Sequence, residues 1–365
     1  MLDWTPMARA RLVLAIALVA ALALPAAASA AKPNAQPLVD AVPFGTHFKD
    51  RVFTSGARVA RASRSGNWRS YPIKDGSSVS AAISDRYANT LDTNVVKTYV
   101  DFLDSLDHGS ELSSLKIFIA PPDEVLAECG GQEGTLACYD SRTKVMVVPG
   151  EQTNTGASGV TTSYVVAHEY GHHIAASRLN TPFNAFAFGP KYWSSYEMVC
   201  DRAIHGVLAP GNEAESYGSN PGEGWAETYA QLRYPEIVWQ FNPIMKPDTG
   251  AFDAARKDVL TPWTANTVKV FKGTFGKRGS RTRRFNFDLT LDGLLQVRLK
   301  GPRKSNYNLF LSSNGRDEGR TTKAGSRDSV DYEAACREEA TEHVTVGVKR
   351  MSGSGPFTLR VSYAG

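Results

Sequence analysis

The stretch that most constrains how this 365-residue chain can fold is residues 165–176, an apolar segment that carries one HExxH motif. On a helix, His168 and His172 project from the same face, where two imidazoles can share a metal ion. Glu169 follows the first histidine by about 100° of turn, which brings its carboxylate beside the open position of the metal. The motif therefore predicts a helix in which His168 and His172 bind zinc and Glu169 is the general base.

A catalytic zinc ion needs three protein ligands and one exchangeable position, so a third ligand must come from another segment. The third histidine of the metzincin pattern is excluded, because the position ten residues after His168 is Arg178. Two pairs of acids with helical spacing remain: Glu197 with Asp201, and Glu223 with Glu227. Either pair would direct one carboxylate to the metal and the other to the outer nitrogen of a ligand histidine.

The first thirty residues have the composition of a secretory signal peptide. Arg9 and Arg11 precede an apolar run over residues 12–24, and Pro25 and the small residues 26–30 follow it. That run is too short to span a bilayer, which argues against a membrane anchor. We therefore expect residues 1–30 to be cleaved and the mature protein to be soluble and secreted, with no membrane partner.

Length and charge limit the remaining possibilities. A chain of 365 residues exceeds the usual size of a single core, which favours two domains. Loss of Asp3, Arg9 and Arg11 with the signal peptide changes the net charge from +4 to +3, which is too mild to indicate a nucleic-acid partner. We expect a monomer that acts on a protein or peptide substrate.

Four cysteines in an exported chain suggest disulfide bonds. Cys129 and Cys138 enclose a glycine-rich loop that a local bond would close. By elimination Cys200 and Cys336 would pair with each other, although either could equally be a buried free thiol.

The order of local patterns suggests three parts after the signal peptide. Residues 31–66 lack sustained periodicity and are expected to be a solvated linker or a pro-segment. Residues 67–262 alternate helical and strand patterns. The expected helices cover residues 91–106, about 160–180, 192–208 and 221–232, and the expected strands cover 115–120 and 144–148. The strand over 144–148 could form a sheet edge that pairs with substrate or lie in the sheet interior.

Residues 266–365 have a different pattern. About seven short alternating runs are separated by turn signals such as Asp292-Gly293 and Asn314-Gly315, which is typical of a β-sandwich. The predicted fold class is therefore an α+β zincin-like catalytic domain followed by an all-β sandwich domain.

The segment that contains Glu223 and Glu227 resembles a known family. Residues 216–229, SYGSNPGEGWAETY, are similar to the lethal-factor-like branch of the gluzincins and to the related secreted Pro-Pro endopeptidases, in which a Ser/Thr-Tyr stretch leads into Glu, an aromatic residue, Ala and Glu. The resemblance implies that Glu223 is the third zinc ligand, that Glu227 supports a ligand histidine and that Tyr217 donates a hydrogen bond in the transition state. Tyr217 precedes Glu223 by six residues, one fewer than the family spacing. Residues 352–361 weakly resemble the closing stretch of the bacterial pre-peptidase C-terminal sandwich.

Together these features predict a secreted zinc-dependent endopeptidase. An alternative is an exported binding protein with a degenerate zincin fold, whose β-sandwich attaches to a surface or a glycan; another is a zinc enzyme that acts on peptidoglycan cross-links or other amides. Glu223 could instead be only a helix-capping carboxylate, with Glu197 as the ligand, and Tyr217 could be a packing aromatic. Trp225 and His173 are expected to belong to the core, and no role is expected for His47, His108, His205 and His343.

Overall fold

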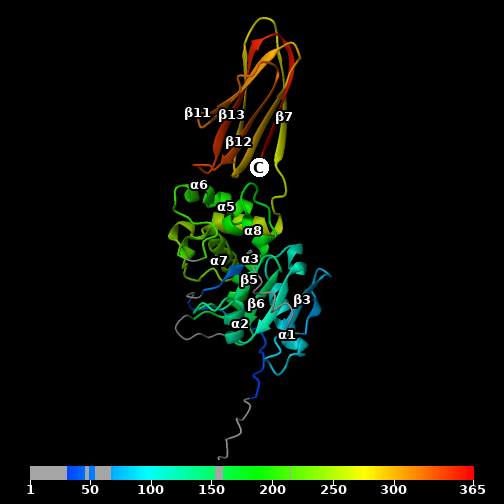
Figure 1. The fold of residues 1–365 in the computed structure, drawn as a ribbon, viewed down its shortest axis with the longest axis vertical. Helices are drawn as coiled ribbons and strands as arrows, with labels where there is room; N and C mark the ends of the chain where they lie inside the picture. The colour runs from blue at the N-terminus through cyan, green and yellow to red at the C-terminus, as the bar shows by residue number, and fades with distance from the viewer. Residues whose placement is uncertain (1–30, 46–48, 54–66, 153–158, 214) are drawn as a thin grey trace, which may run out of the picture. The chain divides into compact units, whose positions relative to one another are not determined.

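The computed structural model of the chain describes residues 31–45, 49–53, 67–152, 159–213 and 215–365 (Figure 1). The predicted signal peptide lies outside the described residues, as does His47. The chain divides into two units, Met1–Lys32 and Pro33–Gly365, and all elements below belong to the second. Among the described residues, no helix combines the length and the apolar character needed to cross a bilayer.

A six-stranded mixed sheet forms the first part of this unit. Its order is β1 (Val52–Phe53), β5 (Cys138–Asp140), β6 (Val145–Pro149), β4 (Lys116–Ala120), β3 (Ser78–Ile83) and β2 (Arg69–Pro72). The central strands β3, β4 and β6 are parallel, and β5 is antiparallel to β6. Strand β6, predicted over residues 144–148, is therefore interior, and the sheet edge on its side is made by β5 and β1.

Eight α-helices accompany the described sheet. They are α1 (Thr93–Leu103), α2 (Pro122–Glu128), α3 (Thr162–Ala176), α4 (Ala185–Phe188), α5 (Lys191–Tyr196), α6 (Val199–Ile204), α7 (Pro221–Arg233) and α8 (Thr249–Leu260). Short 3₁₀ turns lie at η2 (Ser110–Ser114), η3 (Tyr217–Ser219) and η4 (Pro243–Met245). The single helix predicted over 192–208 is wrong: Met198 has a left-handed backbone, with φ 49°, and this divides the segment into α5 and α6.

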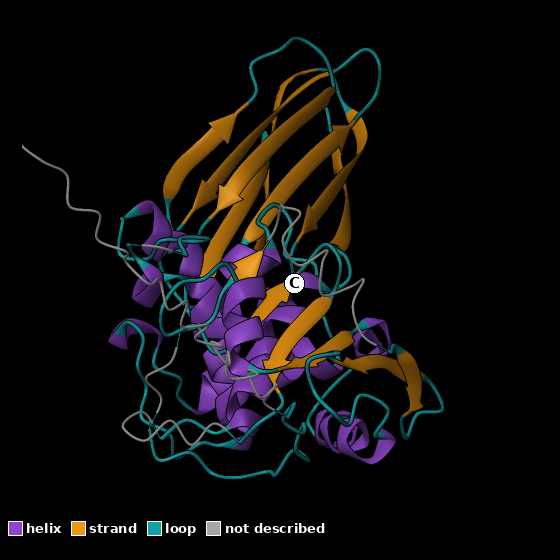
Figure 2. Cartoon of the chain, turned by 60° about the horizontal axis from the view of Figure 1, so that its bottom comes forward, coloured by secondary structure: helices purple, strands orange, loops and turns teal. Residues whose placement is uncertain are grey.

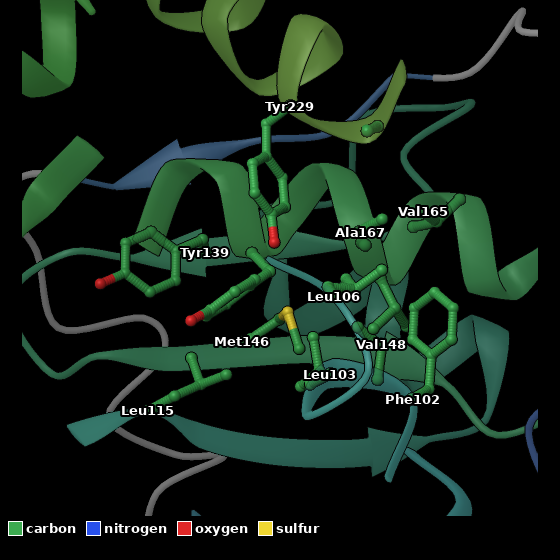
Figure 3. Packing of buried hydrophobic residues seen from close by; sticks show 14 of the residues in the cluster. Phe102, Leu103, Leu106, Leu115, Tyr139, Met146, Val148, Val165, Ala167 and Tyr229 are labelled. Carbon is green, nitrogen blue, oxygen red and sulfur yellow. The ribbon is translucent and has the colours of Figure 1, made fainter. Parts of the chain in front are cut away.

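The core of this part lies between the sheet and the helices. Phe102 and Leu103 of α1, Met146 and Val148 of β6 and Val165 of α3 belong to one buried cluster (Figure 3). Helix α3 is buried along almost its whole length, with only Ala176 exposed among its residues. Any polar side chain on α3 therefore needs a partner inside the protein.

Some of the described residues between 31 and 66 pack against the rest of the protein, although others in the same stretch are exposed. Ala35 and Leu38 belong to the buried cluster, and Gln36 N donates to Gly150 O at 2.6 Å. Farther along, β1 joins the sheet through β5. The linker interpretation is therefore wrong for these residues, because they bury apolar side chains and use their backbone groups in pairing.

Residues 267–363 form a β-sandwich, as predicted. Long strands make up this part of the chain (Figure 2). One sheet has the order β11-β10-β13-β8 and the other β12-β9-β14-β7, with only antiparallel pairs. The strands are β7 (Thr267–Phe275), β8 (Thr282–Leu289), β9 (Gly293–Lys300), β10 (Asn306–Ser313), β11 (Arg316–Arg320), β12 (Arg327–Ala335), β13 (Glu342–Ser352) and β14 (Gly355–Tyr363). They enclose a hydrophobic cluster of their own. The predicted boundary at 262–266 falls between α8 and β7.

Both disulfide bonds considered from the sequence are present. Cys129 bonds to Cys138 across nine residues, and Cys200 bonds to Cys336 across 136 residues. The second bond joins α6 to the segment after β12. Nearby, the Lys191 ammonium donates to Asp292 O at 2.9 Å, so a buried cation and a covalent bond connect the helical part with the sandwich.

Candidate metal centre

Four buried side chains from three separated segments meet at one point. His168 and His172 come from α3, Glu223 from the first turn of α7, and Asp50 from the residue pair that leads into β1. One ligand atom from each side chain can be chosen so that all four lie within 4.8 Å of one another. The structure thus brings the two predicted histidine ligands together with the predicted acid, and adds an acid that the sequence analysis did not single out.

The distances from Glu223 to the two histidines match a tetrahedral metal site, and those from Asp50 lie just outside that range. Zinc bonds of about 2.0–2.2 Å place the ligand atoms of a tetrahedron about 3.3–3.6 Å apart. Glu223 Oε2 lies 3.3 Å from His168 Nε2 and 3.4 Å from His172 Nε2. Asp50 Oδ2 lies 3.7 Å from His168 Nε2 and 3.1 Å from His172 Nε2. Two nitrogen and two oxygen donors at these separations could hold a divalent metal ion.

The local sequences explain how α3 and α7 present these groups. Thr161 caps α3 by accepting a hydrogen bond from Tyr164 N, and Asn220 caps α7 by accepting one from Gly222 N, with Pro221 as the first helical residue. The two helices cross closely at Gly171, where an added Cβ would lie 2.8 Å from Ala226 Cα. This close approach lets the Glu223 carboxylate reach the imidazoles of the facing helix.

Glu227 and Tyr164 lie behind His168 and hold its ring in place. Glu227 Oε2 lies 3.2 Å from His168 Nδ1, and Glu227 Oε1 accepts a hydrogen bond of 2.6 Å from the Tyr164 hydroxyl. A carboxylate behind a ligand histidine fixes the orientation and tautomer of the ring and leaves Nε2 for the metal. Glu227 lies one turn beyond Glu223 on α7 and beside the outer ring nitrogen of His168.

Glu169 lies in the same buried region without a compensating contact. Among the described residues, neither of its carboxylate oxygens has a hydrogen-bond partner, and the residue is fully buried. Burial raises the pKa of Glu169 well above its usual value, and the charge of Asp50 raises it further. With no hydrogen-bond partner on either oxygen among the described residues, this side chain can accept a proton from a neighbouring molecule.

Tyr217 also faces the centre, through Asp50. Its hydroxyl donates a 2.5 Å hydrogen bond to Asp50 Oδ1, and burial and the Asp50 charge raise the pKa of Tyr217 well above its usual value. The hydroxyl therefore remains a donor at any physiological pH. Its partner in this structure is a carboxylate oxygen that belongs to the group of four.

The alternative ligand pair lies elsewhere. Glu197 Oε2 accepts from Arg202 Nη1 at 2.9 Å, and Asp201 pairs with His205. Neither acid belongs to the group of four. His173 lies in the core as expected: Tyr139 Oη is 2.8 Å from its Nδ1, and burial lowers the pKa of His173 to about 4.

Asp50 is the residue of this site that sequence reasoning missed. It lies 118 positions before His168, in a segment with no periodicity and no motif. A single acid in such a segment is ordinarily a surface residue. Only the path of the chain across the centre brings it to the imidazoles.

Comparisons with known proteins do not assign a family. No family model and no curated protein matches the chain. Among solved structures, the pre-peptidase C-terminal domain of collagenase from Bacillus anthracis matches 27% of this chain and 89% of its own length, at 13% identity and a TM-score of 0.20. The Yersinia pseudotuberculosis-derived mitogen matches 27% of this chain and 87% of its own length, at 15% identity and a TM-score of 0.22. At these scores the assignment of a β-sandwich depends on the strand pairing of residues 267–363 itself.

Proposed function

We propose that the chain is a secreted zinc-dependent endopeptidase with a zincin-like catalytic domain of the gluzincin type. In this proposal His168, His172 and Glu223 are the zinc ligands, Glu169 is the general base and Tyr217 stabilises the transition state. Secretion is inferred from the signal-peptide pattern of residues 1–30.

The observation that carries the proposal is the set of distances around Glu223 Oε2. This atom lies 3.3 Å and 3.4 Å from the Nε2 atoms of His168 and His172, which is the edge length of a tetrahedral zinc site. Two neutral imidazoles and one carboxylate are a common ligand set of catalytic zinc. A zinc ion bound there supplies a Lewis acid that polarises the scissile carbonyl and lowers the pKa of the attacking water.

The side chains around the ligands supply the remaining steps. Glu169, whose carboxylate oxygens have no hydrogen-bond partner among the described residues, takes a proton from the attacking water and delivers it to the leaving nitrogen. The Tyr217 hydroxyl donates a hydrogen bond to the oxygen that becomes negatively charged, once Asp50 no longer accepts this bond. Glu227 keeps the His168 ring in one orientation throughout.

A pair of variants tests the proposal. Both chains carry Asp50→Ala, so that this carboxylate does not occupy the centre, and one of them also carries Glu169→Gln. We expect both chains to bind one zinc ion. Only the chain that retains Glu169 should cleave an unbiased peptide library, and a chelator should stop that cleavage. The cleavage sites would also define the substrate class.

Two results would refute the proposal. Proteolysis that survives Glu169→Gln would exclude Glu169 as the base. A chain without stoichiometric zinc would remove the case for an enzyme and leave a binding protein.

A further inference from the structure

Residues 49–53 cross the centre and add the Asp50 carboxylate to the three proposed zinc ligands. Asp50 Oδ2 lies 3.1 Å from His172 Nε2 and 3.7 Å from His168 Nε2, its side chain is fully buried, and among the described residues no donor other than these imidazoles reaches this oxygen. A buried, unpaired carboxylate oxygen is costly unless a cation or a proton compensates it. A shared metal ion is the cation that the neighbouring His168, His172 and Glu223 are arranged to hold.

We propose that Asp50 is a fourth ligand of the metal, and that residues 49–53 keep the proposed peptidase latent until they leave the centre. This inference rests on the proposed function and concerns the regulation of the same site. A zinc ion with four protein ligands is a closed, structural site, whereas a catalytic zinc ion keeps one position open for water. With Asp50 in place the ligand set is complete, and the attacking water has no position.

The burial of the ligands supports a closed state. The side chains of His168, Glu223 and Asp50 are fully buried, and that of His172 is 1% exposed. The proposed ligands thus have almost no surface open to solvent, as expected if residues 49–53 cover the centre. Tyr217 is also engaged, since its hydroxyl donates to Asp50 Oδ1.

The same segment covers the sheet edge beside the centre. Strand β1 pairs in parallel with β5, and three backbone donors of the 136–141 stretch are used: Leu136 N to Lys49 O at 2.9 Å, Tyr139 N to Arg51 O at 3.1 Å and Ser141 N to Phe53 O at 3.0 Å. Without β1, β5 would be the exposed edge strand, and an exposed edge can pair with an extended peptide. Residues 49–53 thus take the place of both the water and a substrate backbone.

The preceding residues hold this segment on the protein. Asp40 accepts a hydrogen bond of 2.6 Å from the Tyr234 hydroxyl and forms an ion pair with Arg233 at the end of α7. Phe44 N donates to Gly159 O at 3.0 Å, just before α3. Anchors at the end of α7 and just before α3 keep the local concentration of Asp50 at the centre high.

Metal accessibility tests the proposal directly and without catalysis. The full chain is prepared with cobalt in place of zinc and with Glu169→Gln to prevent self-cleavage, and a small hydroxamate is titrated while the visible cobalt absorption is followed. If Asp50 holds the centre in at least nine-tenths of the molecules, the apparent hydroxamate Kd is at least about tenfold weaker than in Asp50→Ala. Asp50→Asn, which keeps the shape of the side chain, should bind hydroxamate nearly as well as Asp50→Ala.

A matched control removes an acid from an exposed turn. Asp75→Ala should leave the hydroxamate Kd at the value of the parent chain, because Asp75 bonds only locally to Ser77. In chains that retain Glu169, cleavage of a peptide library should rise at least tenfold with Asp50→Ala and remain unchanged with Asp75→Ala.

The outcomes separate this inference from the proposed function. Equal hydroxamate binding by the parent and both Asp50 variants, each with one cobalt ion, would overturn the role of Asp50 and leave the metal centre intact. Metal-loaded Asp50 variants that still exclude hydroxamate would also overturn it. Absence of metal from every chain would refute the proposed function itself.

Discussion

The carboxylate behind His168 gives the sharpest quantitative prediction. Glu227 accepts a 2.6 Å bond from the Tyr164 hydroxyl and lies 3.2 Å from His168 Nδ1. In Glu227→Gln the volume is kept but the negative charge is lost, so the bond to the ring N–H weakens and the ring is held less firmly. Removal of such a partner typically costs about 10- to 100-fold in metal affinity, which corresponds to about 1.4–2.7 kcal/mol.

The assay is competition for zinc with a chelator of known affinity, in chains that also carry Glu169→Gln. Glu236→Gln is the matched control, because Glu236 is exposed and lies beyond the end of α7. Tyr164→Phe should lower zinc affinity by less than Glu227→Gln does, since it leaves the carboxylate in place. Zinc affinity unchanged by Glu227→Gln would refute the role given to this side chain.

Three further variants test how the site is supported. Gly171→Ala places a Cβ 2.8 Å from Ala226 Cα and should push α3 away from α7. The free energy of unfolding should fall by about 1–3 kcal/mol and zinc should bind more weakly. A variant with the urea unfolding midpoint and the zinc affinity of the parent chain would contradict this. Serine at both Cys200 and Cys336 should lower unfolding stability by about 2–5 kcal/mol, because the bond closes a loop of 136 residues; an unchanged unfolding midpoint would contradict it. Burial lowers the pKa of Lys191 to about 8, so the unfolded chain binds more protons above that pH. Stability relative to Lys191→Met should then rise by about 3 kcal/mol between pH 8 and 10.5, and a flat difference in urea midpoints would refute this.

Features encoded by local sequence were predictable. Asn220 followed by Pro221 predicts the start of α7, and the structure begins that helix at Pro221. Asp92 caps α1 by accepting hydrogen bonds from Asn94 N and Val95 N, a role for which aspartate is favoured. The alternating runs after residue 266 predict seven of the eight strands, and β11 was missed because its sequence, RDEGR, contains no apolar residue.

Features that depend on distant contacts were not predictable from pattern alone. The left-handed backbone at Met198 follows no turn signal and divides a segment that has helical periodicity. The pairs Glu197–Asp201 and Glu223–Glu227 have the same spacing, so choosing between them required a resemblance to a known family. In the structure Glu223 lies beside the histidines, while Glu197 pairs with Arg202.

The position of Asp50 is the clearest case of information absent from the local sequence. Nothing around this residue distinguishes it from a surface acid. Its place at the centre depends on the pairing of β1 with β5 and on the anchors of the preceding segment, all of which are long-range contacts. Contacts of this kind join segments more than eighty residues apart, which periodicity cannot reveal.

In the proposed site, two histidines of α3 and one glutamate of α7 hold a single zinc ion. An anomalous difference map recorded at the zinc absorption edge, from crystals of the chain with Glu169→Gln, tests it directly. We expect one peak about 2.0–2.2 Å from each of His168 Nε2, His172 Nε2 and Glu223 Oε2. A crystal grown with zinc that shows no peak between the two imidazoles would refute this ligand set. A peak that lies beyond bonding distance of the Glu223 carboxylate would refute it as well.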